Sequence, residues 1–304
     1  MSELHPKHRI GKLLLLTATV IWGSSFVIVK DVSGVLSPNT LLAIRFPIAA
    51  LILSLIFIKR FRHFDKKYLI DGAICGVLLY IAYSLQTFGI SFPENTPGKN
   101  AFLTAVYCVL VPFFNWFIIK KRPDKYHIIA AVLCICGIGL VSLKNDFSVG
   151  IGDLLTLGGG VFFAFHIIAL DRFSDNRDPI LLTIVQFASS GVLSLISALT
   201  YDRSGSITFT PELIFSLAYL AVLCTAVTLL FQTIGQKYND PSSSAIILSL
   251  EAVFGVAFSL LLGREDPTPK IMIGFAVIFI AILISETKLA FLWRLPLFKQ
   301  KKKD

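Results

Sequence analysis

Charged residues are scarce in this sequence. Asp, Glu, Lys and Arg make up 15% of the 304 residues, whereas about 25% is typical of a soluble domain. Apolar runs of about 17–25 residues recur along the whole chain, and each is long enough to cross a hydrocarbon core of about 30 Å. The low charge and the repeated apolar runs together predict an integral membrane protein and exclude an ordinary soluble domain.

Ten apolar runs have the length of a membrane span, at residues 11–30, 40–58, 69–91, 99–119, 126–143, 153–171, 179–199, 211–236, 242–262 and 270–287. We therefore predict an all-α integral membrane fold with ten transmembrane helices. The first run follows the basic leader Lys7, His8 and Arg9, so a cleaved signal peptide is the alternative there. Its apolar stretch is longer than the core of a signal peptide, which favours a transmembrane helix.

Patterns that mark catalytic and metal sites are also missing. The chain has five histidines, and its five cysteines, which lie within predicted spans, show no zinc or redox spacing. The run Gly158-Gly159-Gly160 is not a phosphate-binding loop, because it lies within a span and lacks the lysine of such loops. We expect no metal, no cofactor and no enzymatic activity. A polytopic membrane enzyme, a channel and a scaffold are the alternatives to a carrier.

Basic residues are distributed unevenly across the predicted spans. The formal net charge is +9 at pH 7, and most of the 28 Lys and Arg residues fall on the side that holds both termini. Arg45 lies within a span, and the opposite side has only Lys30, Lys99, Lys144, Arg203, Arg264 and Lys270. An excess of Lys and Arg marks the cytoplasmic side of a membrane protein. The pattern predicts cytoplasmic termini and explains the basic charge without a nucleic-acid partner.

The chain contains an internal repeat. GKLLLLTATVIWGSSFVIVK (11–30) aligns with GDLLTLGGGVFFAFHIIALD (152–171), LQTFG (85–89) with FQTIG (231–235), and NAFLTAVY (100–107) with SAIILSLE (244–251). We predict two halves of five spans, residues 1–145 and 146–304, the second ending in a basic cytoplasmic tail. Because five is odd, the second half enters the membrane from the opposite side. Inverted repeats are common in secondary transporters, whose sites lie near the midplane between the repeats.

Short motifs in both halves resemble one family. WGSSFVIVK, LLAIRF, LQTFGI and NAFLTAVYCVLVP, followed by GDLL, AIILSLEAVFG and LLLGRE, resemble the EamA group of the drug/metabolite transporter superfamily over nearly the whole chain. The resemblance implies two inverted five-helix halves in a plasma (bacterial inner) membrane. It also implies a carrier, often an exporter, of small metabolites such as amino acids or related compounds. The second half departs from the first at Phe163, where the first has Trp22, and at Val256, where the first has Pro112.

Polar and aromatic residues within the spans recur at helical spacing, which predicts faces that point away from lipid. Spans 1, 3, 4, 6, 8 and 9 carry these residues, whereas spans 5 and 10 carry almost none. We predict a central, substrate-binding cavity lined by Trp22, Ser25, Tyr83, Gln86, Asn100, Thr104, Tyr107, Phe163, His166, Thr228, Gln232 and Glu251. Spans 5 and 10 are expected to be peripheral and to pack against lipid or against a second copy in a homodimer.

The ionisable residues inside spans each allow two interpretations. Glu251 lies near the middle of its span, where a charge costs at least about 2.5–3.5 kcal/mol. It is a candidate for substrate contact or proton coupling, or a structural carboxyl group. His166 is a second candidate for proton coupling, or a packing residue. Arg45 could bind a substrate carboxylate or brace a neighbouring helix, and its neutral repeat mate Gln186 favours the structural role.

Two prolines lie inside predicted spans and have no proline mate in the other half. Pro47 and Pro112 each remove a backbone hydrogen bond and are expected to kink their helices. The two halves should therefore bend differently. With no nucleotide-binding loop present, the sequence predicts a secondary carrier that works by alternating access. Any energy that it needs must come from a proton gradient, a substrate gradient or a partner protein.

Overall fold

The computed structural model describes residues 6–120, 122–142, 149–174, 177–202, 207–265 and 268–288. Lys144, Arg203 and the predicted basic tail beyond Lys288 lie outside the described residues. The elements are α1 (Pro6–Val32), α2 (Pro38–Ile56), the 3₁₀ helix η1 (Ile58–His63), α3 (Lys66–Ser91), α4 (Pro97–Thr104), α5 (Tyr107–Ile119), α6 (Lys125–Ser142), α7 (Ile151–Ser174), α8 (Pro179–Tyr201), α9 (Pro211–Ala221), the π-helix η2 (Val222–Val227), α10 (Thr228–Lys237), α11 (Pro241–Leu261) and α12 (Pro269–Thr287).

The helices confirm the predicted all-α membrane fold. Within the described ranges, eight helical segments are long and apolar enough to cross a membrane, and the apolar helices α6 and α12 are shorter. Two of the eight spans are composite. One consists of α4 and α5, and the other consists of α9, η2 and α10. These ten segments correspond to the ten apolar runs of the sequence.

Many of the helices begin with the same local signal. A residue with a short polar side chain accepts a hydrogen bond from a backbone N–H of the first turn, and a proline follows it directly. This pairing satisfies an N–H that has no partner within the helix, and proline at the first position loses no bond. The six caps of this kind are Ser37, Thr96, Asp178, Thr210, Asp240 and Thr268.

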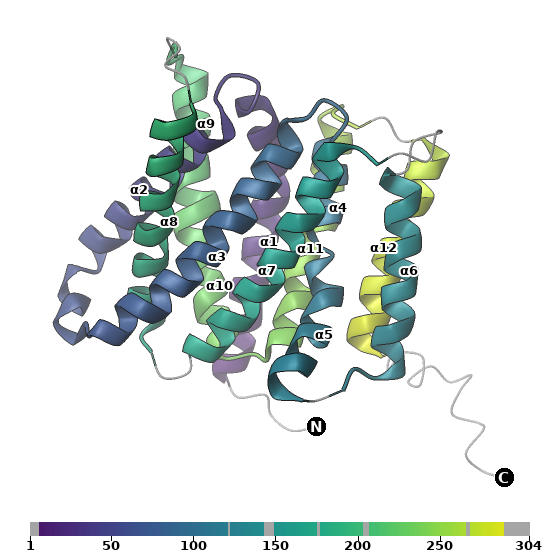
Figure 1. Ribbon diagram of the computed structural model, residues 1–304, viewed down its shortest axis with the longest axis horizontal. Coiled ribbons are helices and arrows are strands. Elements are labelled where there is room, and N and C mark those ends of the chain that lie inside the picture. The colour runs from purple at the N-terminus through teal and green to yellow at the C-terminus, as the bar shows by residue number, and fades with distance from the viewer. Residues whose placement is uncertain are drawn as a thin grey trace.

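The two halves are inverted relative to each other. In Figure 1, α1 runs upward from the N-terminus, whereas its repeat mate α7 runs downward. The pairing of helices follows the repeat: α3 packs on α7 while α10 packs on α1, and α2 packs on its own mate α8. We call the end where α1 begins and α12 ends the terminal end, and the opposite end the distal end.

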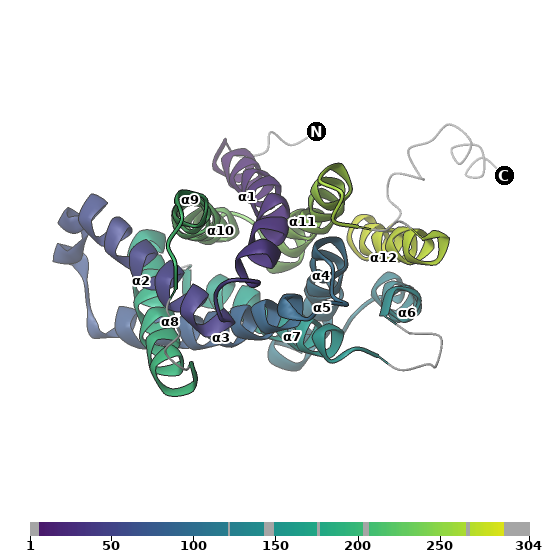
Figure 2. The ribbon, with the colours of Figure 1, turned by 90° about the horizontal axis from the view of Figure 1, so that it is seen from above.

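The predicted peripheral spans lie at one side of the molecule. Helices α6 and α12 pack mainly on each other, and Figure 2 shows them beside α4, α5 and α11 and away from α2 and α8. Gly137 of α6 approaches the backbone of Gly274 in α12 so closely that a side chain at this position would collide with it. The peripheral position of the two helices is therefore confirmed, whereas a homodimer formed through them stays a prediction.

Two of the spans expected as continuous helices are interrupted, one between α4 and α5 and the other by η2, whereas α2 is continuous through Pro47. Around the junction of α4 and α5, several bonds join residues three apart, including that from the Val109 N–H to the Val106 carbonyl. This turn precedes Pro112, which lies inside α5 and offers no N–H to the carbonyl four residues earlier. Pro47 lies inside α2, where Gly191 of α8 packs against its ring.

Candidate functional site

A cavity lies where the two halves meet. Its walls come from α1, α2, α3, α4, α5, α7, α10 and α11, and its volume is about 40 Å³. A water molecule needs roughly 10–15 Å³ of such space, so the cavity has room for a few waters, and a metabolite requires the side chains to move apart. Its lining residues are Trp22, Ser25, Phe26, Val29, Arg45, Tyr83, Gln86, Ile90, Asn100, Tyr107, Phe163, Ile167, Gln232, Leu248 and Glu251.

Aromatic rings form a continuous part of the wall. The Tyr83 ring makes edge contacts with Phe46 and Phe163, with ring centroids 5.5 and 5.3 Å apart, and Phe163 contacts Tyr107 at 6.4 Å. Edge-to-face geometry at these separations is favourable for aromatic pairs. The lining rings Tyr83, Tyr107 and Phe163 come from α3, α5 and α7 and so join both halves around one space, and Phe46 of α2 packs behind Tyr83.

Trp22 is held in the wall by the π-helix of the opposite half. The Trp22 Nε1–H donates a hydrogen bond to the carbonyl oxygen of Cys224 at 3.0 Å. A π-helical turn carries an extra residue and is frequent at functional sites. Ser25, one turn after Trp22, donates its hydroxyl to the Trp22 carbonyl at 2.7 Å. The indole is thereby fixed at one end while its ring lines the cavity.

The single carboxyl group of the cavity is bonded to its own repeat mate. The Tyr107 hydroxyl donates to Glu251 Oε1 at 3.1 Å, and the Glu251 side chain is 5% exposed. Because NAFLTAVY aligns with SAIILSLE, Tyr107 and Glu251 occupy equivalent positions in the two halves. The contact therefore lies near the axis that relates the repeats, which is where the site of an inverted-repeat carrier is expected.

Arg45 supplies the single cationic side chain of the cavity lining. Its Nε–H donates to Thr225 Oγ1 of the π-helix at 3.1 Å, and its guanidinium carbon lies 5.2 Å from the Tyr83 ring centroid. Although Arg45 is 2% exposed, it forms no ion pair within the part of the chain that the structure describes. A buried, unpaired charge is costly, and the cation–π contact with Tyr83 offsets part of that cost.

Opposite charges thus line one cavity without touching. Among the described residues, neither Arg45 nor Glu251 has an oppositely charged group within ion-pair distance, and both side chains border the same space. A ligand that carries both a carboxylate and an ammonium group would match each of them. The cavity therefore presents a cationic and an acidic side chain together with aromatic rings.

Amide side chains complete the polar part of the lining. Gln86 and Gln232, which are repeat mates, both border the cavity, and so does Asn100. Gln86 donates its Nε2–H to Thr104 Oγ1 at 3.0 Å, and Asn100 donates its Nδ2–H to Thr156 Oγ1 at 2.7 Å. Thr104, which we expected in the lining, instead lies behind Gln86 and orients its amide.

His166 and Thr228 also lie away from the cavity lining, contrary to expectation. His166 is fully buried and its Nε2 pairs with Gln186 Oε1 at 2.9 Å, so the ring faces α8. Thr228 is fully buried and directly follows the π-helix Val222–Val227. Gln232, one turn later in α10 (Thr228–Lys237), does border the cavity, so the cavity meets this inward face only at the later turn.

Sequence reasoning missed the apolar part of the lining, which comprises Phe26, Val29, Ile90, Ile167 and Leu248. Apolar residues on a membrane helix give no signal that separates a cavity face from a lipid face. Arg45, for which we favoured a structural role, donates a hydrogen bond to Thr225 and also borders the cavity. Its position is therefore compatible both with bracing a helix and with contacting a substrate. No cluster of three or more metal-binding side chains occurs within the described ranges.

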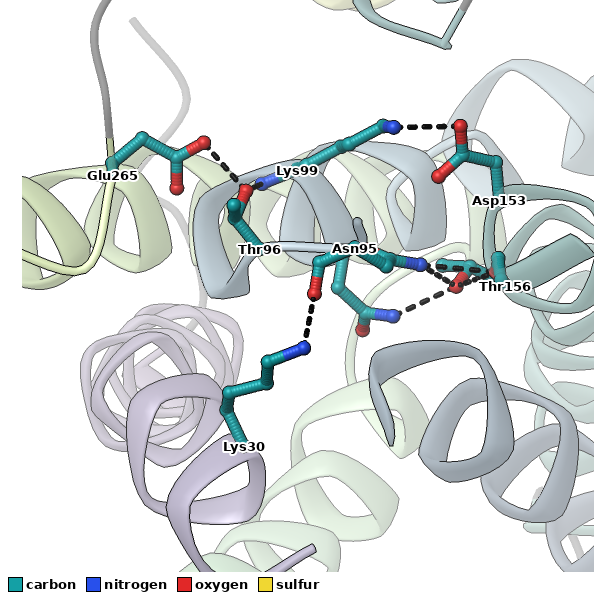
Figure 3. A network of polar contacts seen from close by, with 9 residues as sticks. Lys30, Asn95, Thr96, Lys99, Asp153, Thr156 and Glu265 are labelled. Atoms are coloured by element: carbon teal, nitrogen blue, oxygen red, sulfur yellow. Dashed lines mark hydrogen bonds and ion pairs between the residues drawn. The ribbon is translucent and has the colours of Figure 1, made fainter. Parts of the chain in front are cut away.

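A polar network joins the two halves at the distal end, above the cavity (Figure 3). The Lys99 ammonium forms an ion pair of 2.7 Å with Asp153, and the Asp153 side chain is fully buried. Asn95 donates its Nδ2–H to the Gly152 carbonyl at 2.9 Å and to Thr156 Oγ1 at 2.8 Å. The network thus links the loop before α4 and the first turn of α4 to the first turns of α7.

Two further groups strengthen the distal end. The Lys30 ammonium donates to the carbonyl oxygens of Ile90, Phe92 and Asn95 at 2.8, 2.7 and 3.0 Å, and so caps the end of α3. Glu265 accepts hydrogen bonds from Thr96 Oγ1 at 2.5 Å, the Gly98 N–H at 3.1 Å and Ser259 Oγ at 2.9 Å. A carboxylate at the start of a helix is favoured by the helix dipole.

The fold and the cavity define a class: a polytopic helical membrane protein whose inverted halves enclose a cavity lined by polar and aromatic residues. The sequence pattern of the EamA-like transporter family matches the chain twice, over residues 9–143 and 150–287. The chain therefore belongs to the EamA-like transporter family. It is an integral, multi-pass membrane protein, and its family is one of transporters rather than enzymes.

Individual relatives agree with this assignment. An uncharacterized transporter of Archaeoglobus fulgidus is 31% identical over 278 residues, which cover 91% of this chain and 86% of that protein. The uncharacterized transporter YyaM of Bacillus subtilis is 20% identical and covers 91% of this chain and 93% of its own length. A crystal structure with 16% identity has a TM-score of 0.70 and covers 93% of this chain and 98% of that one, which shows a common fold.

Proposed function

We propose that this protein is a secondary carrier that exports small zwitterionic metabolites, such as amino acids or related compounds, by alternating access around the central cavity. The observation that carries the proposal is the separation of Arg45 from Glu251 across one buried space. A zwitterion places a carboxylate near the guanidinium and an ammonium group near the carboxylate, and so relieves two unpaired charges together. The aromatic wall accommodates the remainder of the molecule.

The polar network at the distal end supports a mechanism of alternating access. With Lys99 paired to Asp153 above the cavity, we infer that this conformation is closed at the distal end. Release of substrate at that end requires the network to break, and the cavity must widen for substrate to enter. Rocking of one half against the other around a fixed site is the usual movement of carriers built from inverted repeats.

We further propose that both termini are cytoplasmic and that the protein resides in a plasma (bacterial inner) membrane. The basic residues at the terminal end support this orientation, since Lys and Arg are enriched on the cytoplasmic side. Labelling of single cysteines introduced at Arg62 and at Val35, in right-side-out vesicles, tests it. Exclusive labelling of Val35→Cys by an impermeant reagent is expected, and exclusive labelling of Arg62→Cys would reverse the orientation.

Proteoliposomes provide the test of transport. The purified protein should exchange labelled zwitterions for unlabelled ones, and Arg45→Gln should weaken competition by compounds with a carboxylate more than competition by simple amines. The matched control is Gln186→Ala at the equivalent position of the other half, which does not border the cavity. If no amino acid, nucleoside, sugar or amine moves under any imposed gradient, the carrier assignment is wrong.

Glu251 is the proposed site of proton coupling. Protonation of this carboxyl group would remove a charge from the cavity, and its hydrogen bond with Tyr107 connects it to the other half. Glu251→Gln should therefore abolish accumulation driven by a proton gradient and leave exchange of substrate intact. Accumulation at the parental level would make Glu251 a structural residue. The same measurement on His166→Gln tests His166, which is the other candidate for proton coupling.

A further inference from the structure

An apolar groove on the outer surface lies apart from the central cavity. It runs between α2, α3 and α8, in the part of the molecule nearer the terminal end, and has a volume of about 580 Å³. Its walls include Leu69, which is 56% exposed, and Val192, which is also 56% exposed. The lining residues are Ser54, Phe61, Phe64, Leu69, Val77, Ile184, Val185, Ala188, Ser189, Val192 and Leu193. In a membrane protein, such a surface faces lipid chains.

A basic segment borders this groove at the terminal end. The η1 helix and the start of α3 contain Lys59, Arg60, Arg62, Lys66 and Lys67 within nine residues, all exposed. The same segment contributes Phe61 and Phe64 to the groove, and the two rings stack with centroids 6.1 Å apart. In this one segment, the phenylalanine rings therefore line the apolar groove, and the Lys and Arg side chains form the exposed basic surface beside it.

The acidic side chains near this segment form ion pairs with only two arginines, Arg60 and Arg177. Arg60 pairs with Asp178 at 2.7 Å, while Arg177 pairs with Asp71 at 3.0 Å and with Asp65 at 3.5 Å. Within the part of the chain that the structure describes, no carboxylate forms an ion pair with the other basic residues of the segment, which are Lys59, Arg62, Lys66 and Lys67. Four cations are thus available at the mouth of an apolar groove.

We propose that this groove and its basic border form a binding site for an anionic phospholipid. One acyl chain lies against the apolar walls, and the phosphate of the headgroup binds the cluster Lys59, Arg62, Lys66 and Lys67. Clustered Lys and Arg residues directly beside a transmembrane helix attract anionic lipids, whereas a zwitterionic lipid gains little from four extra cations. An anionic phospholipid matches both features, because its acyl chain suits the apolar walls and its phosphate suits the four cations at one end of the groove.

The position of the groove gives the lipid a structural consequence. Its walls come from α2 and α3 of the first half and from α8 of the second half. A lipid bound there contacts both halves near the terminal end, where the ion pairs between the halves are more exposed than the distal pair of Lys99 and Asp153. The site does not depend on the proposed transport function, and binding alone tests it.

Native mass spectrometry of the purified protein provides the measurement. Phosphatidylglycerol and phosphatidylcholine with identical acyl chains are titrated separately, and soluble glycerol phosphate tests the headgroup alone. We expect phosphatidylglycerol to bind roughly tenfold or more tightly than phosphatidylcholine, and glycerol phosphate to leave occupancy unchanged. Equal affinity for the two lipids would overturn the proposal, as would a second copy of the chain occupying the groove in cross-linking experiments.

Variants assign the lipid to this site. Replacement of Lys59, Arg62 and Lys66 by Gln should remove the preference for phosphatidylglycerol, whereas the matched replacement of Lys7, Arg9 and Lys12 by Gln should keep it. Ala188→Trp, which fills the groove without a change of charge, should also reduce binding. Leu199→Trp on the same helix, where Leu199 is 83% exposed, is its control. Equal losses in both members of either pair would refute the site.

Discussion

The distal and terminal ends are built from equivalent helices and are held together by different chemistry. At the distal end, Gly89 of α3 packs against Gly152 of α7, and a side-chain carbon on Gly89 would lie 2.7 Å from the Gly152 carbonyl. At the terminal end, the mates Gly235 and Gly11 pack in the same way, with a corresponding distance of 2.9 Å. The close approach of the helices is therefore a property of the repeat.

The side chains around these glycine contacts differ between the two ends. Thr156 and Asp153 belong to the distal network, and their repeat mates at the terminal end are Leu15 and Lys12. Asp153 pairs with Lys99, whereas the mate of Lys99 is Ser243, which cannot form an ion pair with Lys12. Among the described residues, the fully buried Asp153 thus has no acidic counterpart at the terminal end, although the glycine contacts occur at both ends.

This difference teaches how a symmetric scaffold can favour one conformation. Separating one partner of a buried ion pair from the other leaves an uncompensated charge, which is strongly destabilising. Opening of the distal end should therefore require Lys99 and Asp153 to part and to be solvated together. The terminal end also has ion pairs between the halves: Arg60 with Asp178, in which Arg60 is 52% exposed, and Arg177 with Asp71, whose side chains are 17% and 18% exposed. Both are more exposed than the distal pair, so we expect the terminal end to separate at a lower cost.

The largest expected effect comes from breaking the distal ion pair. Asp153→Asn leaves the Lys99 ammonium buried without a counter-charge, which costs about 3–5 kcal/mol in comparable buried pairs. The loss should destabilise the state closed at the distal end, and thermal unfolding of the purified protein measures it. The control is the combined replacement Lys99→Met with Asp153→Leu. If this apolar pair is as unstable as the single variant, the buried charge is not the cause.

An intermediate effect is expected from acid at Asp202, which follows α8. Burial raises the pKa of this carboxyl group, but hydrogen bonds from Ser37, Thr40 and Asn39 at the start of α2 outweigh it and hold the pKa below its ordinary value of 3.8. Because the folded pKa is lowered, this stabilisation is present above the unfolded pKa and is lost as the pH falls through the folded pKa. Unfolding midpoints measured between pH 5 and pH 2 should show this loss.

The Asp202→Asn variant is the control for that pH dependence. It should be less stable than the parent at pH 5 and should show a weaker decline toward pH 2, because residue 202 no longer titrates. An identical decline in the parent and the variant would assign the acid sensitivity to other carboxyl groups.

The smallest effect is expected at the terminal end. Arg60→Gln removes one partner of a half-exposed ion pair, and exposed pairs of this kind contribute about 0.2–1 kcal/mol. Unfolding should therefore shift only slightly, and less than for Asp153→Asn. A loss as large as that of the distal variant would remove the distinction between the two ends.

The spans, the inverted halves and much of the cavity could be predicted from the sequence. Span length depends on the thickness of the membrane, so apolar runs alone locate the helices. Inverted repeats relate equivalent residues by one axis, so mates that lie near this axis contact each other. Tyr107 and Glu251, both expected at the cavity, are such a pair. Trp22 and Gln232 were found because polar or aromatic groups inside a span stand out against aliphatic neighbours.

Other features could not be predicted because they depend on contacts between distant segments. The π-helix Val222–Val227 has no distinctive composition, yet it supplies the Cys224 carbonyl that holds Trp22 and the Thr225 hydroxyl that holds Arg45. Glu265 lies in a loop between spans, and its role appears only when Thr96 and Gly98 are folded against it. His166 pairs with Gln186 of α8, and a helical repeat pattern alone does not identify that neighbour.

The most direct test of distal opening is a reversible cross-link across the distal network. In a variant whose five native cysteines are replaced by alanine, Asn95→Cys and Thr156→Cys place two thiols where the Asn95 amide and the Thr156 hydroxyl are 2.8 Å apart. Exchange of substrate in proteoliposomes is measured before oxidation, after oxidation and after reduction. We predict that the cross-link stops exchange and that reduction restores it. Exchange at the full rate while the cross-link is intact would show that transport does not require the distal end to open.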